Sequence, residues 1–191
     1  NKNPQQTKLG QKINLDKFFK APGNFSAVAM KDGKIVYERY NKKLKANPDF
    51  YAHGMSMTKT ALGLTMGHLL CSGQIKSLDD TTSKYSQSLN NSIYKDITVR
   101  NLLRMSSGIN ENRDNERKLN HIMMNRQNNG SNDLIQVIQK IKTKFSEQGK
   151  MSRYHSLDIT AASILINEIT KKPVAQVFFE NVFPNIKPEG S

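Results

Sequence analysis

An Asp-Gly pair between two strand-like runs is the feature that most constrains how this chain can fold. Residues 25–30, FSAVAM, and residues 35–40, IVYERY, carry aromatic and β-branched side chains that favour strands. The tetrapeptide between them, KDGK, is typical of a tight hairpin turn, since Asp-Gly accepts left-handed backbone conformations. The sequence therefore predicts an antiparallel hairpin. Further strands are expected beside it, because a two-stranded sheet is only marginally stable alone.

The rest of the chain is polar or has the apolar spacing of helices, and no further strand is convincing. A strongly amphipathic helix is expected to begin at Ser131 or Asn132 and to keep its apolar side as far as Phe145. The polar, Asn-rich residues 110–130 before it are expected to form a flap or an insertion. The other predicted helices cover residues 56–70, 99–105, 157–170 and 173–183.

The helix predicted over residues 56–70 has a core-facing stripe and a clear end. Gly73 lies just past the helix and is expected to act as its C-cap. Cys71 lies beside the stripe and is expected to be a buried core thiol. As the only cysteine, it excludes an internal disulfide and a cysteine-based metal site. The stripe consists of Leu62, Met66, Leu69 and Leu70.

The composition indicates a globular protein and argues against several partners. The formal net charge is +13, but 22 of the 29 basic residues are lysines, and they are spread along the chain without a block of like charge. We therefore predict no nucleic-acid partner. No apolar run approaches the roughly 18 residues that span a membrane. No metal-ligand spacing or phosphate-binding loop is present, so no metal or organic cofactor is predicted.

Ser56 and Lys59 form the pair with the strongest chemical potential. On a helix, residues i and i+3 share a face, so the amine can accept the proton of the serine hydroxyl. Desolvation and the helix N-terminus both disfavour the charged ammonium there. The structural alternative is an N-cap serine followed by a solvated lysine. A second copy, Ser92 to Lys95, has no apolar helical run behind it and is interpreted as accidental.

After the hairpin the chain carries four motifs in order: SMTKT, GQIKSLDDTTSKY, ITVRNLLRMSSGI and RYHSLDITAASILINEITKKPVAQVFFENVF. In these motifs and in their order the chain resembles the serine β-lactamase-like superfamily, which includes penicillin-binding proteins, class C β-lactamases and 6-aminohexanoate-dimer hydrolases. The likeness spans roughly residues 25–184. The variant YHSLD is closest to the 6-aminohexanoate-dimer hydrolase branch.

The resemblance implies an α/β (α+β) fold of the β-lactamase/transpeptidase type, with an N-terminal hairpin of an antiparallel sheet and a helical subdomain. Residues 1–20 would be a polar lead-in and residues 21–191 the hydrolase domain. Ser56 would be the acylated nucleophile, Lys59 its general-base partner, and Tyr154 a second proton-transfer group near Ser56 and the leaving group.

Three further residues have weaker implied roles. Ser156 stands where the family often has Asn and would hydrogen-bond Lys59 or the substrate, while a helix N-cap remains an equal alternative. His53, three residues before the serine, would line the site. His155 fills the variable middle position of the second motif and is expected to point away.

The implied activity is hydrolysis of a small-molecule or peptide-like amide or ester through a serine acyl-enzyme. The family's third motif, Lys/His-Thr/Ser-Gly, is missing, and its C-terminal strands are expected from a complementary chain or a second copy. Without them, the hairpin edge and the apolar face of the first long helix would be exposed, and self-association is expected. The alternative is a non-catalytic member that binds a peptide, glycan or protein.

The start of the chain at Asn1 rather than Met indicates that upstream residues are missing, as a removed signal peptide, as a tether or as residues outside the given sequence. Relatives that act on cell-wall peptides or β-lactams work outside the cytoplasm. The resemblance therefore implies a periplasmic or secreted bacterial location.

Overall fold

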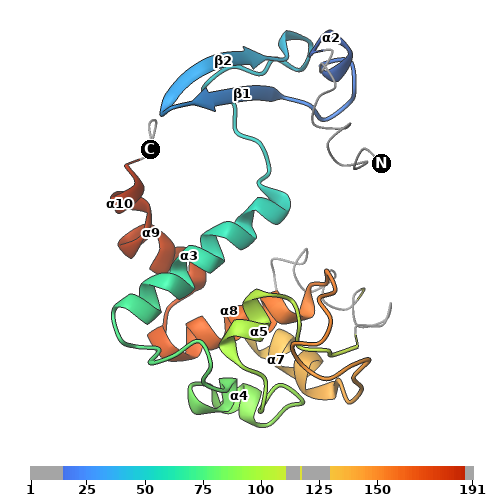
Figure 1. The fold of residues 1–191 in the computed structure, drawn as a ribbon, viewed down its shortest axis with the longest axis vertical. Coiled ribbons are helices and arrows are strands. Elements are labelled where there is room, and N and C mark those ends of the chain that lie inside the picture. The colour runs from blue at the N-terminus through green and yellow to red at the C-terminus, as the bar shows by residue number, and fades with distance from the viewer. Residues whose placement is uncertain (1–14, 111–116, 118–129, 188–191) are drawn as a thin grey trace, which may run out of the picture. The chain divides into compact units, whose positions relative to one another are not determined.

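The computed structural model describes residues 15–110, 117 and 130–187, so most of the expected flap over residues 110–130 lies outside the described part. The chain forms two compact units, with the boundary between Gly54 and Met55 (Figure 1). The first unit contains α2 (Leu15–Phe18), β1 (Ser26–Lys31), β2 (Lys34–Tyr40) and the 3-10 turn η1 (Lys42–Leu44).

The second unit is helical in its described part. It begins with the 3-10 turn η2 (Met55–Met57). Its remaining elements are α3 (Thr58–Cys71), η3 (Thr82–Lys84), α4 (Gln87–Asn90), α5 (Val99–Leu103), α7 (Gly130–Lys140), α8 (Leu157–Thr170), α9 (Val174–Asn181) and α10 (Phe183–Ile186).

The hairpin is confirmed: β1 starts and ends one residue later than predicted, whereas β2 starts one residue earlier and ends at the predicted Tyr40. β1 and β2 pair antiparallel, and both central turn residues, Asp32 and Gly33, have positive φ angles of 49° and 75°. This is the conformation for which Asp-Gly is selected, because its twist matches that of the strands. One β-bulge interrupts the ladder, since the pair after Ala29–Tyr37 is Met30–Ile35.

The hairpin is the whole sheet in the described residues, and its apolar side chains lie open within its unit. Val28, Met30, Ile35 and Val36 are each more than half exposed. The expectation of an exposed hairpin edge is therefore confirmed.

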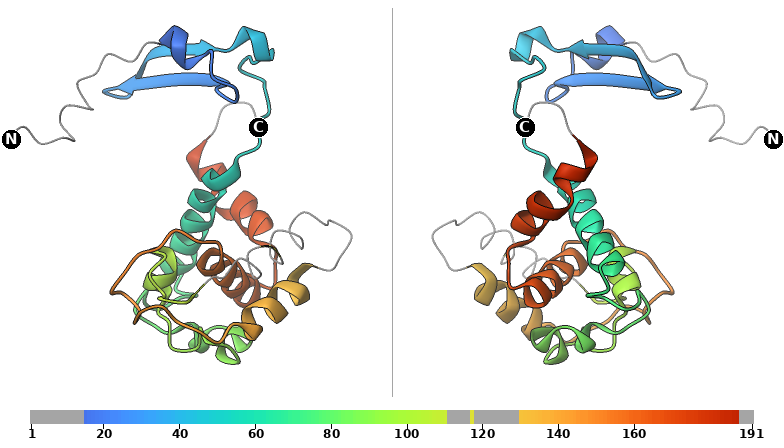
Figure 2. Two further views of the ribbon diagram at one scale, coloured as in Figure 1. Left: turned by 90° about the vertical axis from the view of Figure 1, so that its right-hand side faces the viewer. Right: turned by 90° about the vertical axis from the view of Figure 1, so that its left-hand side faces the viewer.

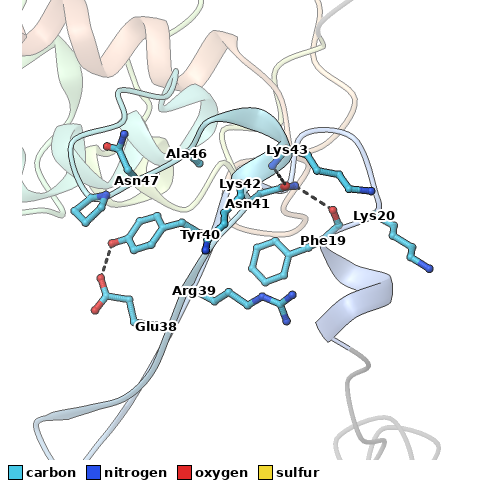
Figure 3. A pocket seen from close by; sticks show the side chains of 11 residues that line it. Phe19, Lys20, Glu38, Arg39, Tyr40, Asn41, Lys42, Lys43, Ala46 and Asn47 are labelled. Carbon is cyan, nitrogen blue, oxygen red and sulfur yellow. Dashed lines mark hydrogen bonds between the residues drawn. The ribbon is translucent and has the colours of Figure 1, made fainter.

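A hollow of about 1000 Å³ lies beside the hairpin within the first unit (Figure 3). Asn41 organises its wall, since its buried amide group donates hydrogen bonds of 3.0 Å to the carbonyls of Phe19 and Asn24. The Arg39 guanidinium lies 5.0 Å from the centroid of the Phe19 ring. Helix α2 and the buried Phe19 thus fall within the expected lead-in over residues 1–20, and both pack into the first unit.

Helix α8 is the centre of the second unit (Figures 1 and 2). It contacts α3, α4, α5, α7 and α9. Its sequence, LDITAASILINEIT, is apolar on most sides, which is typical of a helix surrounded by protein. Its bounds agree with the predicted residues 157–170. Thr98 caps α5 as predicted, accepting a hydrogen bond from the Asn101 amide.

The residues of the GQIKSLDDTTSKY motif close the loop between α3 and α5. Asp79 binds Arg100 through two hydrogen bonds of 2.7 and 3.0 Å, which hold the pKa of that carboxyl below its usual value. Asp80 accepts a hydrogen bond from the Tyr85 hydroxyl and forms an ion pair with Lys84. This motif therefore fixes the start of α5.

Three expectations about helices are corrected. The helix expected to extend to Phe145 ends at Lys140, because residues 143–145 pair with residues 108–110 instead. Cys71 is exposed, since it lies about 200° round the helix from the buried Leu69. The apolar stripe of α3 is buried rather than open, because α8 and α9 cover it.

Candidate active site

Ser56 lies in the turn η2, immediately before α3. The residue before it, Met55, has a φ of 44°, a left-handed conformation that a side chain disfavours. The carbonyl of Met55 accepts a 2.7 Å hydrogen bond from the Thr58 hydroxyl, which fixes this turn. The α-helix predicted to begin at Ser56 therefore begins two residues later, with Met57 in the N-cap position.

The side chains of Ser56, Lys59 and Tyr154 meet in the second unit. Ser56 Oγ lies 2.5 Å from the Tyr154 hydroxyl and accepts a 3.2 Å hydrogen bond from Lys59 Nζ. The serine hydroxyl is thus committed to these two groups, and α3 has no side-chain cap bond. This geometry disfavours the alternative of a simple capping serine with a solvated lysine.

The pKa of Tyr154 is lowered by its neighbours in this cluster. Its hydrogen bond with Ser56, and then its hydrogen bond with and the charge of Lys59, lower the pKa of the phenol below its ordinary value, near 10. A lowered pKa makes the phenolate more accessible at moderate pH. The cluster therefore contains a hydroxyl, a cation and a phenol able to exchange one proton.

The cluster is open to solvent within its own unit. Tyr154 is 69% exposed, Ser56 is exposed and Lys59 is half-buried. A substrate carbonyl can therefore approach Ser56 without displacing any part of the helical core.

The second Ser-x-x-Lys copy has a different environment. Ser92 is buried, donates a 2.7 Å hydrogen bond to the Leu89 carbonyl and accepts one of 3.1 Å from the Tyr94 amide. Its hydroxyl closes a turn, which agrees with the interpretation of this copy as accidental.

The supporting residues are distributed over both units. Ser156 occupies the N-cap position of α8 but makes no side-chain cap bond, and its role toward Lys59 or a substrate stays a prediction. His53 belongs to the first unit, and its role likewise stays a prediction.

Sequence reasoning missed the partner of His155. The histidine turns into the core, where its Nε2 lies 3.3 Å from Asp158 Oδ2, and the two side chains are 3% and 0% exposed. The available signal was an acidic residue within the otherwise apolar run of residues 157–166.

The described residues contain neither a metal-binding cluster nor a membrane-spanning helix. Within the described ranges, no group of three or more His, Cys, Asp or Glu side chains is placed to hold a metal ion. None of the helices described here combines the length and apolarity needed to cross a bilayer.

A hairpin, a helical unit and Ser56 just before α3 fit the fold class of β-lactamases and penicillin-binding proteins. The chain belongs to the β-lactamase family, whose model matches residues 15–187. Comparison with curated proteins gives no significant match.

Solved structures with the same fold share about a fifth of the residues. A Bacillus anthracis protein assigned as a 6-aminohexanoate-dimer hydrolase aligns with a TM-score of 0.68 and 20% identity, over 93% of this chain and 48% of that one. An octameric penicillin-binding protein homologue from Pyrococcus abyssi gives 0.67 and 20%, over 90% and 43%. A D-stereospecific amidohydrolase from a Streptomyces species gives 0.61 and 20%, over 76% and 48%. This chain thus spans about half the length of these relatives.

Proposed function

We propose that this protein is a serine hydrolase that cleaves an amide or ester bond through an acyl-enzyme on Ser56. The observation that carries the proposal is the position of Ser56 Oγ, 2.5 Å from the Tyr154 oxygen and 3.2 Å from Lys59 Nζ. Membership of the β-lactamase family and the likeness to an amidohydrolase support the general class.

The chemistry follows from the proton positions. Ser56 Oγ attacks the substrate carbonyl carbon while its proton passes to the phenolate of Tyr154. Lys59, for which the resemblance implied the role of general-base partner, acts in this scheme as the cation that stabilises the phenolate. The amide of Ser56, just before α3, would donate to the developing oxyanion. The tetrahedral intermediate collapses, the leaving group departs with the proton, and Ser56 holds the acyl group. Water then attacks the acyl carbon and gives one proton to the Tyr154 phenolate. The bond between the acyl carbon and Ser56 Oγ breaks, the carboxylic acid leaves, and Oγ takes the proton back from Tyr154.

The active assembly includes strands beyond the described residues. The two open edges of the hairpin and its exposed apolar side chains support this proposal, as does a length about half that of the relatives. We propose that a complementary C-terminal segment or a second copy supplies these strands and the second oxyanion donor. We also propose an extracytoplasmic location, on the basis of the family resemblance.

The test is covalent labelling with a fluorophosphonate probe, followed by intact-mass and peptide mass spectrometry. We expect a single adduct on Ser56, absent from Ser56→Ala and retained in Ser92→Ala, which alters the matched Ser-x-x-Lys copy. Labelling should fall strongly in Tyr154→Phe and Lys59→Met.

A folded protein that shows no adduct at Ser56 would contradict the proposed hydrolase and favour the alternative, a binding protein with an unused site. An adduct that persists in Ser56→Ala would place the reactive group elsewhere.

A further inference from the structure

Tyr154 is exposed, but the next residue, His155, is buried. Tyr154 is 69% exposed, whereas the His155 side chain is 3% exposed and lies against Asp158, itself fully buried. The 3.3 Å separation of His155 Nε2 from Asp158 Oδ2 joins the segment before α8 to the first turn of that helix. This contact places the imidazole against the Asp158 carboxylate, so the position of His155 depends on how firmly Asp158 is itself held.

Asp158 has two further partners from distant parts of the unit. Its Oδ1 accepts a 3.0 Å hydrogen bond from the hydroxyl of the fully buried Tyr94, and its Oδ2 accepts one of 3.3 Å from the Ser107 amide. The carboxylate thus ties α8 to the turn before α5 and to the loop after it. His155 is held against an atom that cannot shift without disturbing three segments.

The preceding residue is held as well. The Arg153 amide donates a 2.9 Å hydrogen bond to the carbonyl of Met105, two residues from Ser107 in the same loop. The backbone of Tyr154 is therefore anchored on both sides, by Arg153 before it and by His155 after it. Anchoring at both ends fixes the point from which the Tyr154 side chain starts, and the contacts of the phenol with Ser56 and Lys59 then set the direction of the ring.

We propose that His155 is a positioning residue, which through Asp158 holds the backbone of Tyr154 so that the phenol oxygen stays against Ser56 Oγ. The effect of His155 on catalysis rests on the proposed hydrolase function, whereas its effect on the position of the phenol can be tested without that function. His155 itself touches no substrate.

A matched pair of variants separates this polar contact with Asp158 from simple packing. In His155→Gln the side-chain amide nitrogen can occupy the place of Nε2 and donate to Asp158. In His155→Asn the side chain is one methylene shorter and does not reach. The readout is the pH titration of Tyr154, followed by NMR on protein with ring-labelled tyrosine, with the signal assigned by its loss in Tyr154→Phe.

In the wild type we expect Tyr154 to titrate below the ordinary tyrosine value near 10, since Ser56 and Lys59 favour its phenolate. His155→Asn should return the midpoint toward the ordinary value near 10, and His155→Gln should restore the low midpoint. The rate of fluorophosphonate labelling at Ser56 should fall by about 10- to 100-fold in His155→Asn, because a small misplacement of a catalytic group costs that much.

Thr65→Val is the control for general destabilisation. Thr65 is fully buried in α3 and donates to the Ala61 carbonyl, so its loss weakens the same core without touching the Tyr154 segment. The Tyr154 titration should not move in this variant. If neither His155 variant folds, Tyr94→Phe, which removes one hydrogen bond from Asp158, should raise the Tyr154 midpoint.

Several results would overturn the proposal. They are a wild-type Tyr154 that titrates at the ordinary value near 10, a folded His155→Asn or Tyr94→Phe with an unchanged Tyr154 midpoint, and an equal loss of the low midpoint in the Asn and Gln variants. A wild type that takes no probe but shows the expected titrations would reject the hydrolase function and leave the positioning role standing.

Discussion

The amine of Lys59 lies 5.2 Å from the centroid of the Tyr154 ring, although 95 positions separate the two residues (154 − 59). The same amine donates a hydrogen bond to Ser56, so one cation faces both the hydroxyl and the aromatic ring. A cation in that place stabilises the phenolate over the phenol. The hydrogen bond with Ser56, and after it the bond with and the charge of Lys59, therefore lower the pKa of Tyr154 and with it the pH at which the site can accept a proton.

The first prediction concerns that pH dependence. The rate of Ser56 labelling should rise with pH, with a midpoint below the ordinary tyrosine value near 10, because the phenolate is the acceptor. Lys59→Met should move the midpoint up by removing the cation, and Tyr154→Phe should abolish this rise. Labelling reactions quenched at set times, across a series of pH values, measure both effects. A lower pH midpoint in Lys59→Met would contradict the role of Lys59 as the cation that stabilises the phenolate.

Linkage gives a second readout of the same group. Because the folded-state pKa of Tyr154 is lowered, its contribution to stability is fully present above the unfolded value near 10 and is lost as pH falls through the folded value. Between these two values, the stability difference between wild type and Tyr154→Phe should grow with pH.

The second prediction concerns the strained residue before the nucleophile. Met55 has a φ of 44°, and Met57 has a right-handed φ of −62°, while their exposures of 71% and 73% are closely matched. Met55→Gly should stabilise the protein by about 1 kcal/mol by relieving the left-handed strain. Met57→Gly should destabilise it by about 0.5–1 kcal/mol. Urea unfolding measures both.

Relief of the Met55 strain should also cost reactivity. Strain at such a turn holds Ser56 in place, so Met55→Gly should label more slowly although it is more stable. Equal destabilisation by both glycines would show that the left-handed turn is not strained.

The third prediction tests how closely two loops approach. Gly108 has a φ of 74°, and an added Cβ would overlap the carbonyl oxygen of Ser146. Gly149 has a similar φ of 78°, but its added Cβ would lie 3.6 Å from Asn101. Gly149→Ala should cost about 1–2 kcal/mol for its left-handed backbone. Gly108→Ala should cost clearly more, because a backbone carbonyl must move. Similar losses in thermal unfolding would argue against the close approach.

The fourth prediction concerns the open hairpin. Two sheet edges and four well-exposed apolar side chains should make the protein self-associate. The double variant Val28→Lys, Val36→Lys should reduce association, because charge on an edge opposes strand pairing. Tyr51→Lys is the control, since Tyr51 is 92% exposed and lies outside the strands. Sedimentation that shows a wild-type monomer of 21.6 kDa would refute this prediction.

The sequence by itself determined the elements that turn residues, helix caps and apolar runs specify locally. Asp32 and Gly33 specify the hairpin because few residue pairs accept its turn, and Thr98 specifies the start of α5 by capping it. The bounds of α8 followed from its apolar run. The spacing of Ser56 and Lys59 placed a hydroxyl and an amine one turn apart, while Tyr154 entered only through a family resemblance.

Tertiary structure decided what depends on contacts between distant residues. It ended α7 at Lys140 because residues 143–145 pair with residues 108–110, a competition that helical periodicity does not contain. It brought Tyr154 to Ser56 and buried His155 against Asp158 because α8 packs beside α3 and α5. Local signals such as the Thr98 cap specify a helix start. The directions of side chains in the segment before α8, such as Tyr154 and His155, follow from the tertiary contacts that those side chains make.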